Sequence, residues 1–142
     1  MKSMIAIFFA ACVLFATPVQ AEEQRIAIVV SARSGIKAIS AKEVRRAYLG
    51  ASIVLDGLEI KPVINRSDKL AGEVFLQRVL FMSAEAYERQ LLARSFRGGS
   101  LPKTYENLTD LLAALRKDNS AISYMLYETA INTPEIRIIG NL

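Results

Sequence analysis

Three segments of the sequence place an arginine directly beside small hydroxyl or glycine residues: Arg33-Ser34-Gly35, Arg66-Ser67-Asp68 and Arg97-Gly98-Gly99-Ser100. These residue types bind small anions. A guanidinium forms charge-assisted hydrogen bonds with phosphate or carboxylate, hydroxyls donate, and glycines expose backbone N–H groups. The pattern therefore predicts anion binding, with five candidate ligand-binding residues: Arg33, Ser34, Arg66, Ser67 and Asp68.

The segment around Arg66 has the best context of the three because it directly precedes a predicted helix. The first N–H groups of a helix lack intrahelical partners, and its N-terminus carries partial positive charge. Both effects favour an oxyanion near Asp68–Leu70. The alternative interpretation is structural: Ser67 or Asp68 only caps the helix, and the arginine is an ordinary solvated charge.

Composition excludes several kinds of chemistry. The chain has no histidine and a single cysteine, Cys12, which lies in an apolar N-terminal segment. The rest of the chain therefore has no thiol nucleophile, no Ser-His-Asp triad and no zinc site of the usual ligand type. Acidic residues are numerous, but no pair has a spacing that singles it out for acid–base catalysis. We expect no enzyme activity, no metal and no cofactor.

The N-terminus has the three parts of a secretory signal peptide. Lys2 supplies a positive start, residues 4–16 are apolar, and Val19-Gln20-Ala21 is a cleavage site of the small-x-small type. A retained anchor is the alternative, but the apolar stretch is shorter than the roughly 20 residues that a spanning helix needs. Cleavage after Ala21 leaves residues 22–142 in the periplasm, with 17 basic and 14 acidic side chains. Because this net charge of +3 is small and dispersed, we expect no nucleic-acid binding.

Residues 22–142 form one predicted domain, since no repeat or linker divides them. Ser40 and Glu43 predict a capping box for a helix that ends at Gly50, and Pro62 predicts a strand at a sheet edge or with a bulged start. The patterns predict strands over 25–31, 53–55, 59–64, 121–126 and 135–139, and helices over 41–49, 69–81, 84–94, 107–117 and 127–131. This order is typical of an α/β fold, a mixed sheet flanked by helices.

Three stretches together resemble a known family. They are residues 39–50 (ISAKEVRRAYLG), 60–68 (IKPVINRSD) and 121–124 (AISY). Their order and spacing resemble the substrate-binding proteins of phosphate ABC importers, which have the type 2 periplasmic binding protein fold. In that family a strand delivers an arginine ahead of a helix that starts Gly-Ser-Gly-Thr, and a later strand reads GAIGY. The resemblance implies that this chain folds like one lobe of such a protein, and that Arg66 matches the family's arginine.

Two departures from the family pattern affect the expected affinity. The Gly-Ser-Gly-Thr start falls on residues 69–72 (KLAG), which contain no hydroxyl, although Ser67 lies close enough to replace one. The family also clamps its ligand between two lobes, whereas residues 22–142 suffice for about one. Losing two or three charge-assisted donors together with a lobe removes on the order of 5 kcal/mol, or several thousandfold in dissociation constant.

The resemblance implies an exported, non-catalytic protein that binds phosphate or another small anion weakly for a membrane transporter or sensor. The alternative is an interaction module without a small-molecule ligand, or a chain that pairs with a second copy as a homodimer. The environment of Arg66 distinguishes the two. Anion binding requires an exposed Arg66 in a concavity, whereas an interaction module is expected to pair it with a carboxylate such as Asp68 or Asp56.

Overall fold

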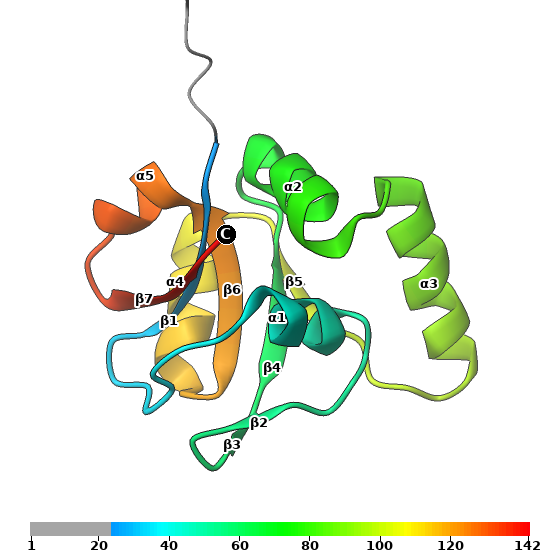
Figure 1. Cartoon of the computed structure of the whole chain (residues 1–142), viewed down its shortest axis with the longest axis horizontal. Coiled ribbons are helices and arrows are strands. Elements are labelled where there is room, and N and C mark those ends of the chain that lie inside the picture. Colours follow the sequence, from blue (N-terminus) through cyan, green and yellow to red (C-terminus); the bar gives the residue numbers. More distant parts are fainter. Residues whose placement is uncertain (1–23) are drawn as a thin grey trace, which may run out of the picture.

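A computed structural model describes residues 24–142 of the protein. The predicted signal peptide, residues 1–21, lies outside the described residues. The elements in chain order are β1 (Ile26–Ser31), α1 (Ala41–Tyr48), β2 (Val54–Leu55), β3 (Leu58–Glu59), β4 (Lys61–Asn65), α2 (Lys69–Phe75), the π-helical segment η1 (Leu76–Leu80), α3 (Ala84–Phe96), β5 (Lys103–Tyr105), α4 (Leu108–Lys117), β6 (Ala121–Leu126), α5 (Tyr127–Ile131) and β7 (Ile136–Asn141). Figure 1 shows their arrangement.

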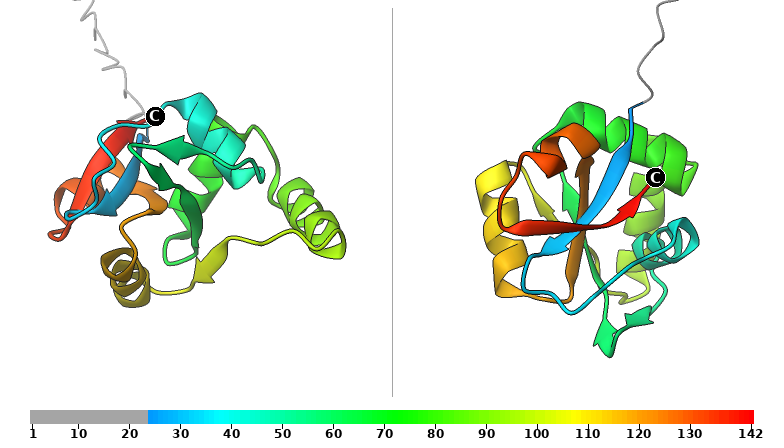
Figure 2. Two further views of the ribbon diagram at one scale, coloured as in Figure 1. Left: turned by 90° about the horizontal axis from the view of Figure 1, so that it is seen from below. Right: turned by 60° about the vertical axis from the view of Figure 1, so that its left-hand side comes forward.

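Five strands form a mixed sheet in the order β5-β4-β6-β1-β7, and β2 and β3 form a separate hairpin. Strand β4 runs parallel to both β5 and β6, whereas β1 runs antiparallel to β6 and β7. The loop after β4 and the loop after β1 therefore leave the sheet at opposite ends. The first and last strands also meet, because Ile26 and Leu142 exchange backbone hydrogen bonds of 2.9 and 2.8 Å (Figure 2).

Helices cover both faces of the sheet, and the side chains of β1 alternate between them. Ile26, Ile28 and Val30 belong to the larger core cluster, which includes buried residues of α1, α2 and η1. Ala27 and Val29 belong to the smaller cluster, which includes buried residues of α4 and α5. Every residue of β1 is buried, as the apolar run predicts, because the strand lies between β6 and β7 with helices on both sides.

Most predicted elements are confirmed. Ser40 and Glu43 form the reciprocal capping box of α1. Ser83 caps α3 and Asn107 caps α4 through their side chains. The predicted α/β fold with a mixed sheet flanked by helices is therefore present, and the capping residues place its helices to within about two residues.

Four features differ from the sequence-based prediction. The predicted strand over 59–64 is divided into β3, which pairs with β2, and β4, which belongs to the five-stranded sheet. Strand β4 is interior rather than at an edge, and it tolerates Pro62 because β5 pairs with it only from Val63 onward. The predicted helix over 69–81 is divided into α2 and η1 and ends at Phe81, which has a left-handed φ of 54°. Strand β5 was not predicted, because its three residues carry no apolar pattern.

Candidate functional site

The carboxyl end of β4 presents the residues that the sequence singles out, and a buried asparagine fixes their position. Asn65, which is 2% exposed, donates from Nδ2 to the carbonyl oxygen of Tyr124 over 2.8 Å. Its Oδ1 accepts hydrogen bonds from the backbone N–H and the hydroxyl of Ser67, at 2.9 and 2.6 Å. The Ser67 hydroxyl therefore already uses its only proton within the protein. Asn65 is a positioning residue that sequence reasoning missed, although a polar residue at the end of an apolar strand is a usable signal.

Arg66 is exposed at this end of the sheet. Its backbone N–H donates to the Tyr105 carbonyl oxygen over 2.9 Å, which ties the loop to the end of β5. Its Nη1 lies 3.8 Å from Oε1 of Glu106, and the two side chains are 51% and 73% exposed. An exposed ion pair at this distance contributes little, so Arg66 remains available to another anion.

Asp68 caps α2. Its Oδ1 accepts hydrogen bonds from the N–H groups of Leu70 and Ala71, at 3.0 and 3.3 Å. These are donors that an oxyanion at the helix start would use, and the Asp68 carboxylate adds negative charge at the same place. The observed contacts of Asp68 are therefore those of a helix cap. Arg66 is the group of this segment that is left to bind an anion.

A cavity of about 380 Å³ opens beside Arg66, between α2 and α3. Its wall is largely apolar and aromatic, and it includes Phe75 and Tyr124, whose rings stack with centroids 3.8 Å apart and planes 4° apart. Burial raises the pKa of Tyr124 to about 12, although a hydrogen bond to the Asn65 backbone and the charge of Arg66 act in the opposite direction. Tyr124 is therefore neutral at physiological pH. We call this space the Arg66 cavity.

The charges around the Arg66 cavity are mixed. Two cationic side chains, Arg66 and Lys69, face four carboxylates, which are Asp68, Glu73, Glu88 and Glu106. Lys69 lies 4.0 Å from Glu73 on the same helix. The cavity therefore offers one available guanidinium, an apolar wall and a surplus of negative charge. Such an arrangement favours a ligand with a single acidic group and an apolar body over a dianion.

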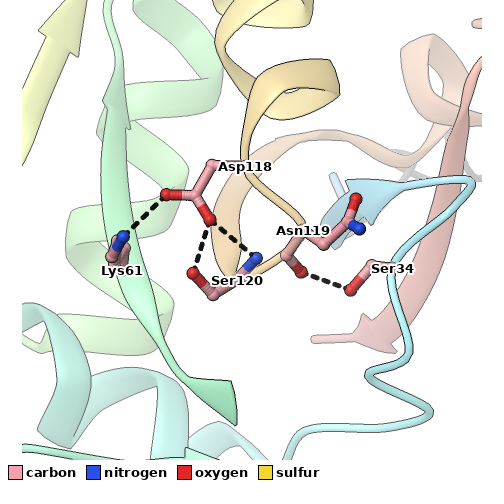
Figure 3. Close-up of polar contacts among 5 residues, drawn as sticks. All are labelled: Ser34, Lys61, Asp118, Asn119 and Ser120. Carbon is pink, nitrogen blue, oxygen red and sulfur yellow. Dashed lines mark hydrogen bonds and ion pairs between the residues drawn. The ribbon is translucent and has the colours of Figure 1, made fainter.

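Arg33 and Ser34, the other predicted ligand-binding residues, lie at the opposite end of the sheet from Arg66. Ser34 is buried, and its hydroxyl donates to the Asn119 carbonyl oxygen over 2.5 Å (Figure 3). The same hydroxyl accepts from the Ile36 N–H at 3.3 Å. Arg33 is exposed on the turn after β1. The structure thus brings Arg66, Ser67 and Asp68 together but separates them from Arg33 and Ser34, because β1 runs antiparallel to β6 while β4 runs parallel to it.

A second polar cluster lies near Ser34 (Figure 3). Asp118 Oδ1 accepts hydrogen bonds from the hydroxyl and the N–H of Ser120, at 2.5 and 3.0 Å, and its Oδ2 lies 3.0 Å from Nζ of Lys61. The Ser120 hydrogen bond is the main cause that lowers the pKa of Asp118 to about 2, and Lys61 adds to it. This cluster fastens the loop before β6 to the start of β4.

Among residues 24–142, no three His, Cys, Asp or Glu residues are grouped so that they could hold a metal ion. No helix in the same range is both long enough and apolar enough to cross a bilayer.

No protein-family model and no curated protein matches the chain. Two solved structures are similar to it. An ABC-type phosphate transport receptor from Vibrio cholerae has a TM-score of 0.50 and 11% sequence identity over 82% of this chain and 45% of the receptor. A possible phosphate binding protein from Planctomyces limnophilus has a TM-score of 0.50 and 14% identity over 82% of this chain and 41% of that protein. The fold resembles one lobe of a phosphate-binding protein. At these identities the likeness concerns the fold alone, and the chain spans less than half the length of either protein.

Proposed function

We propose that the protein is a non-catalytic, solute-binding-like domain of the periplasm. In this proposal it holds a small organic anion weakly in the Arg66 cavity and presents it to a membrane transporter or sensor. The observation that carries the proposal is the position of Arg66, which lines a cavity with a largely apolar wall and has only a long, exposed contact with Glu106. The fold neighbours, whose names describe phosphate transport or binding, support a binding role over catalysis.

The charges of the Arg66 cavity define the class of anion further. A monocarboxylate with an apolar body makes one charge-assisted contact with Arg66 and covers the partly exposed apolar wall at Leu76 and Leu91. Inorganic phosphate gains no apolar contact, and its second charge meets the surplus carboxylates. We therefore expect benzoate to bind more tightly than phosphate. The expected dissociation constant of benzoate is about 1 mM, which corresponds to a binding free energy of about −4 kcal/mol.

An amide NMR titration with benzoate, inorganic phosphate and acetate tests the proposal. We expect benzoate to shift the amides of β4, α2 and α3 around the cavity, and Arg66→Gln to weaken its binding at least about tenfold, since a charge-assisted bond is lost. Arg33→Gln is the matched control, because it removes an exposed arginine at the opposite end of the sheet. Equal benzoate affinity in the wild type and in Arg66→Gln would contradict the proposal.

A second candidate function, protein docking, is favoured by one observation. Leu92 and Phe96 on α3 and Leu101 in the following loop are 58%, 83% and 46% exposed. Exposed apolar side chains of this kind mark interaction surfaces. The first partner to test for this surface is a second copy of the chain. Sedimentation velocity at rising protein concentration, with Phe96→Ser as the comparison, tests this function. A wild type that stays monomeric at high concentration excludes the homodimer.

A further inference from the structure

A second and larger cavity lies at the amino end of β4. It has a volume of about 700 Å³ and is bordered by the end of α1, the start of β4, α3, the loop before β5, and the end of α4. We call it the basic cavity. None of the five predicted ligand-binding residues lines it. An inference about this cavity therefore does not depend on the proposed function of the Arg66 cavity.

The basic cavity has a surplus of positive charge. Four cationic side chains line it, Lys61, Arg94, Lys103 and Lys117, together with two carboxylates, Glu59 and Asp118. Both carboxylates already have partners. Asp118 pairs with Lys61 at 3.0 Å, and Glu59 accepts a hydrogen bond from the Ser52 hydroxyl at 2.9 Å.

The remaining three cations form no ion pair in the described part of the chain. Lys103 and Lys117 form no ion pair within residues 24–142. They come from β5 and α4, and Arg94 comes from α3, so three separate elements bring unpaired positive charges to one concave surface. Like charges around a concavity repel one another and raise the local potential for a multivalent anion.

Arg94 carries the clearest sign of a missing partner. Its Nη1 is buried and has no hydrogen-bond partner in the described residues. Buried donors are nearly always satisfied in folded proteins, so this one requires an explanation. Arg94 also lines the basic cavity, so an anion bound there lies beside this guanidinium and compensates its charge.

Two glycines provide the space for the Arg94 side chain, because neither has a Cβ atom. A Cβ atom on Gly50 would lie 3.0 Å from Cζ of Arg94, and a Cβ on Gly99 would lie 2.8 Å from its Cγ. Gly50 follows α1, whose carboxyl end carries partial negative charge and stabilises a guanidinium beside it. The side chain is therefore held at the wall of the basic cavity without an ion-pair partner among residues 24–142.

From these observations we propose that the basic cavity binds a small soluble oxyanion with two or more negative charges, of the diphosphate type. Arg94, Lys103 and Lys117 neutralise the charge, while the Lys61–Asp118 pair fixes the start of β4 beneath it. This preference is opposite to that of the Arg66 cavity, where carboxylates outnumber cations and a monoanion is favoured.

Isothermal titration calorimetry of the full-length mature protein with inorganic pyrophosphate tests the proposal, with acetate at equal ionic strength as the monovalent comparison. We expect saturable pyrophosphate binding and no acetate binding. Lys103→Gln and Lys117→Gln are each expected to weaken pyrophosphate binding about five- to tenfold, because each variant removes one charge-assisted contact. Both side chains are exposed, so these variants are expected to fold normally.

Two control variants separate site binding from general charge effects. Lys42→Gln removes an exposed lysine of α1 that does not line the basic cavity, and Arg66→Gln removes one of the two cations of the Arg66 cavity. We expect both to bind pyrophosphate as the wild type does. Absence of saturable binding, or equal weakening by Lys42→Gln and Lys103→Gln, would overturn the proposal. The Arg66→Gln result also keeps the two proposals distinguishable.

Discussion

The two ends of β4 open into cavities with opposite charge balances. At the carboxyl end, two cations face four carboxylates around a largely apolar wall. At the amino end, four cations face two carboxylates, and both carboxylates already have partners. The comparison shows that an arginine beside a serine does not by itself define an anion site. The decisive features are which donors the fold has already satisfied and which charges the neighbouring elements contribute.

The largest expected effect on stability concerns Tyr48 of α1, which packs against the middle of β4. Tyr48 is fully buried, donates to the Val63 carbonyl oxygen over 2.8 Å, and contacts the rings of Phe75 and Tyr124. Tyr48→Ala is expected to lower the free energy of unfolding by about 3–5 kcal/mol, because it leaves a large cavity beneath the strand. Urea denaturation measures this change. Tyr48→Phe, which removes only the hydroxyl, should cost about 1–2 kcal/mol; an equal loss for both variants would contradict the packing argument.

The next prediction distinguishes ligand binding at the carboxyl end of β4 from ligand binding at its amino end. Asn65→Ala removes three hydrogen bonds at the carboxyl end, one buried and two partly buried, and should lower the free energy of unfolding by about 2–3 kcal/mol. Because Asn65 positions the loop that carries Arg66, benzoate affinity should also fall, whereas pyrophosphate affinity should not change. Calorimetry with benzoate and with pyrophosphate measures the change in each affinity. Ser67→Ala is the matched control for the hydroxyl alone, and unaltered benzoate binding in Asn65→Ala would show that the asparagine does not position Arg66.

A smaller effect is expected at the amino end, and it depends on pH. The folded-state pKa of Asp118 is lowered to about 2 from its usual 3.8, so its ionised form stabilises the fold above pH 3.8, and this contribution is lost as the pH falls through about 2. Asp118→Asn should therefore lower the free energy of unfolding by about 1 kcal/mol at pH 7, allowing for solvent screening. Urea midpoints of both proteins between pH 7 and pH 2 should converge toward the acid end. A difference that stays constant over this range would contradict the role of the ionised carboxylate.

The smallest expected effect on stability concerns Glu106, the carboxylate nearest to Arg66. Glu106→Gln should change the free energy of unfolding by less than about 0.5 kcal/mol, because the ion pair is long and exposed. The same change removes a competitor for the guanidinium, so benzoate affinity should rise a few-fold. The NMR titration measures this gain, and Glu85→Gln on α3 is a control carboxylate that does not line the cavity. A loss of benzoate affinity in Glu106→Gln would show that this carboxylate helps to bind the ligand.

Local signals in the sequence predicted the elements well because their causes are local. The Ser40–Glu43 capping box, the Ser83 and Asn107 caps and the buried run of β1 depend on residues within a few positions of one another. The sequence also placed the segment around Arg66 between a strand and a helix, and the structure confirms this placement. It could not predict β5, because this strand forms only through its pairing with β4.

The candidate site was less predictable than the fold. Asp68 was foreseen as a possible cap, and the structure shows that it takes N–H donors of the helix start. Glu106 and Tyr124 come from elements distant in sequence, so their approach to Arg66 depends on the strand order. The charge balance of each cavity has the same origin. The surplus of cations at Arg94, Lys103 and Lys117 arises only when α3, β5 and α4 border one concave surface.

The sequence by itself determined most of the segments that form strands and helices, and that ordinary thiol, histidine and zinc chemistry is absent from residues 22–142. Propensity, capping and composition act within a few residues, so they can be read along the chain. Only the tertiary structure decided that Arg33 and Ser34 lie far from Arg66, and that the two ends of β4 carry opposite charge balances. Strand direction and order determine which loops share an end of the sheet, and these are set by packing between segments far apart in sequence.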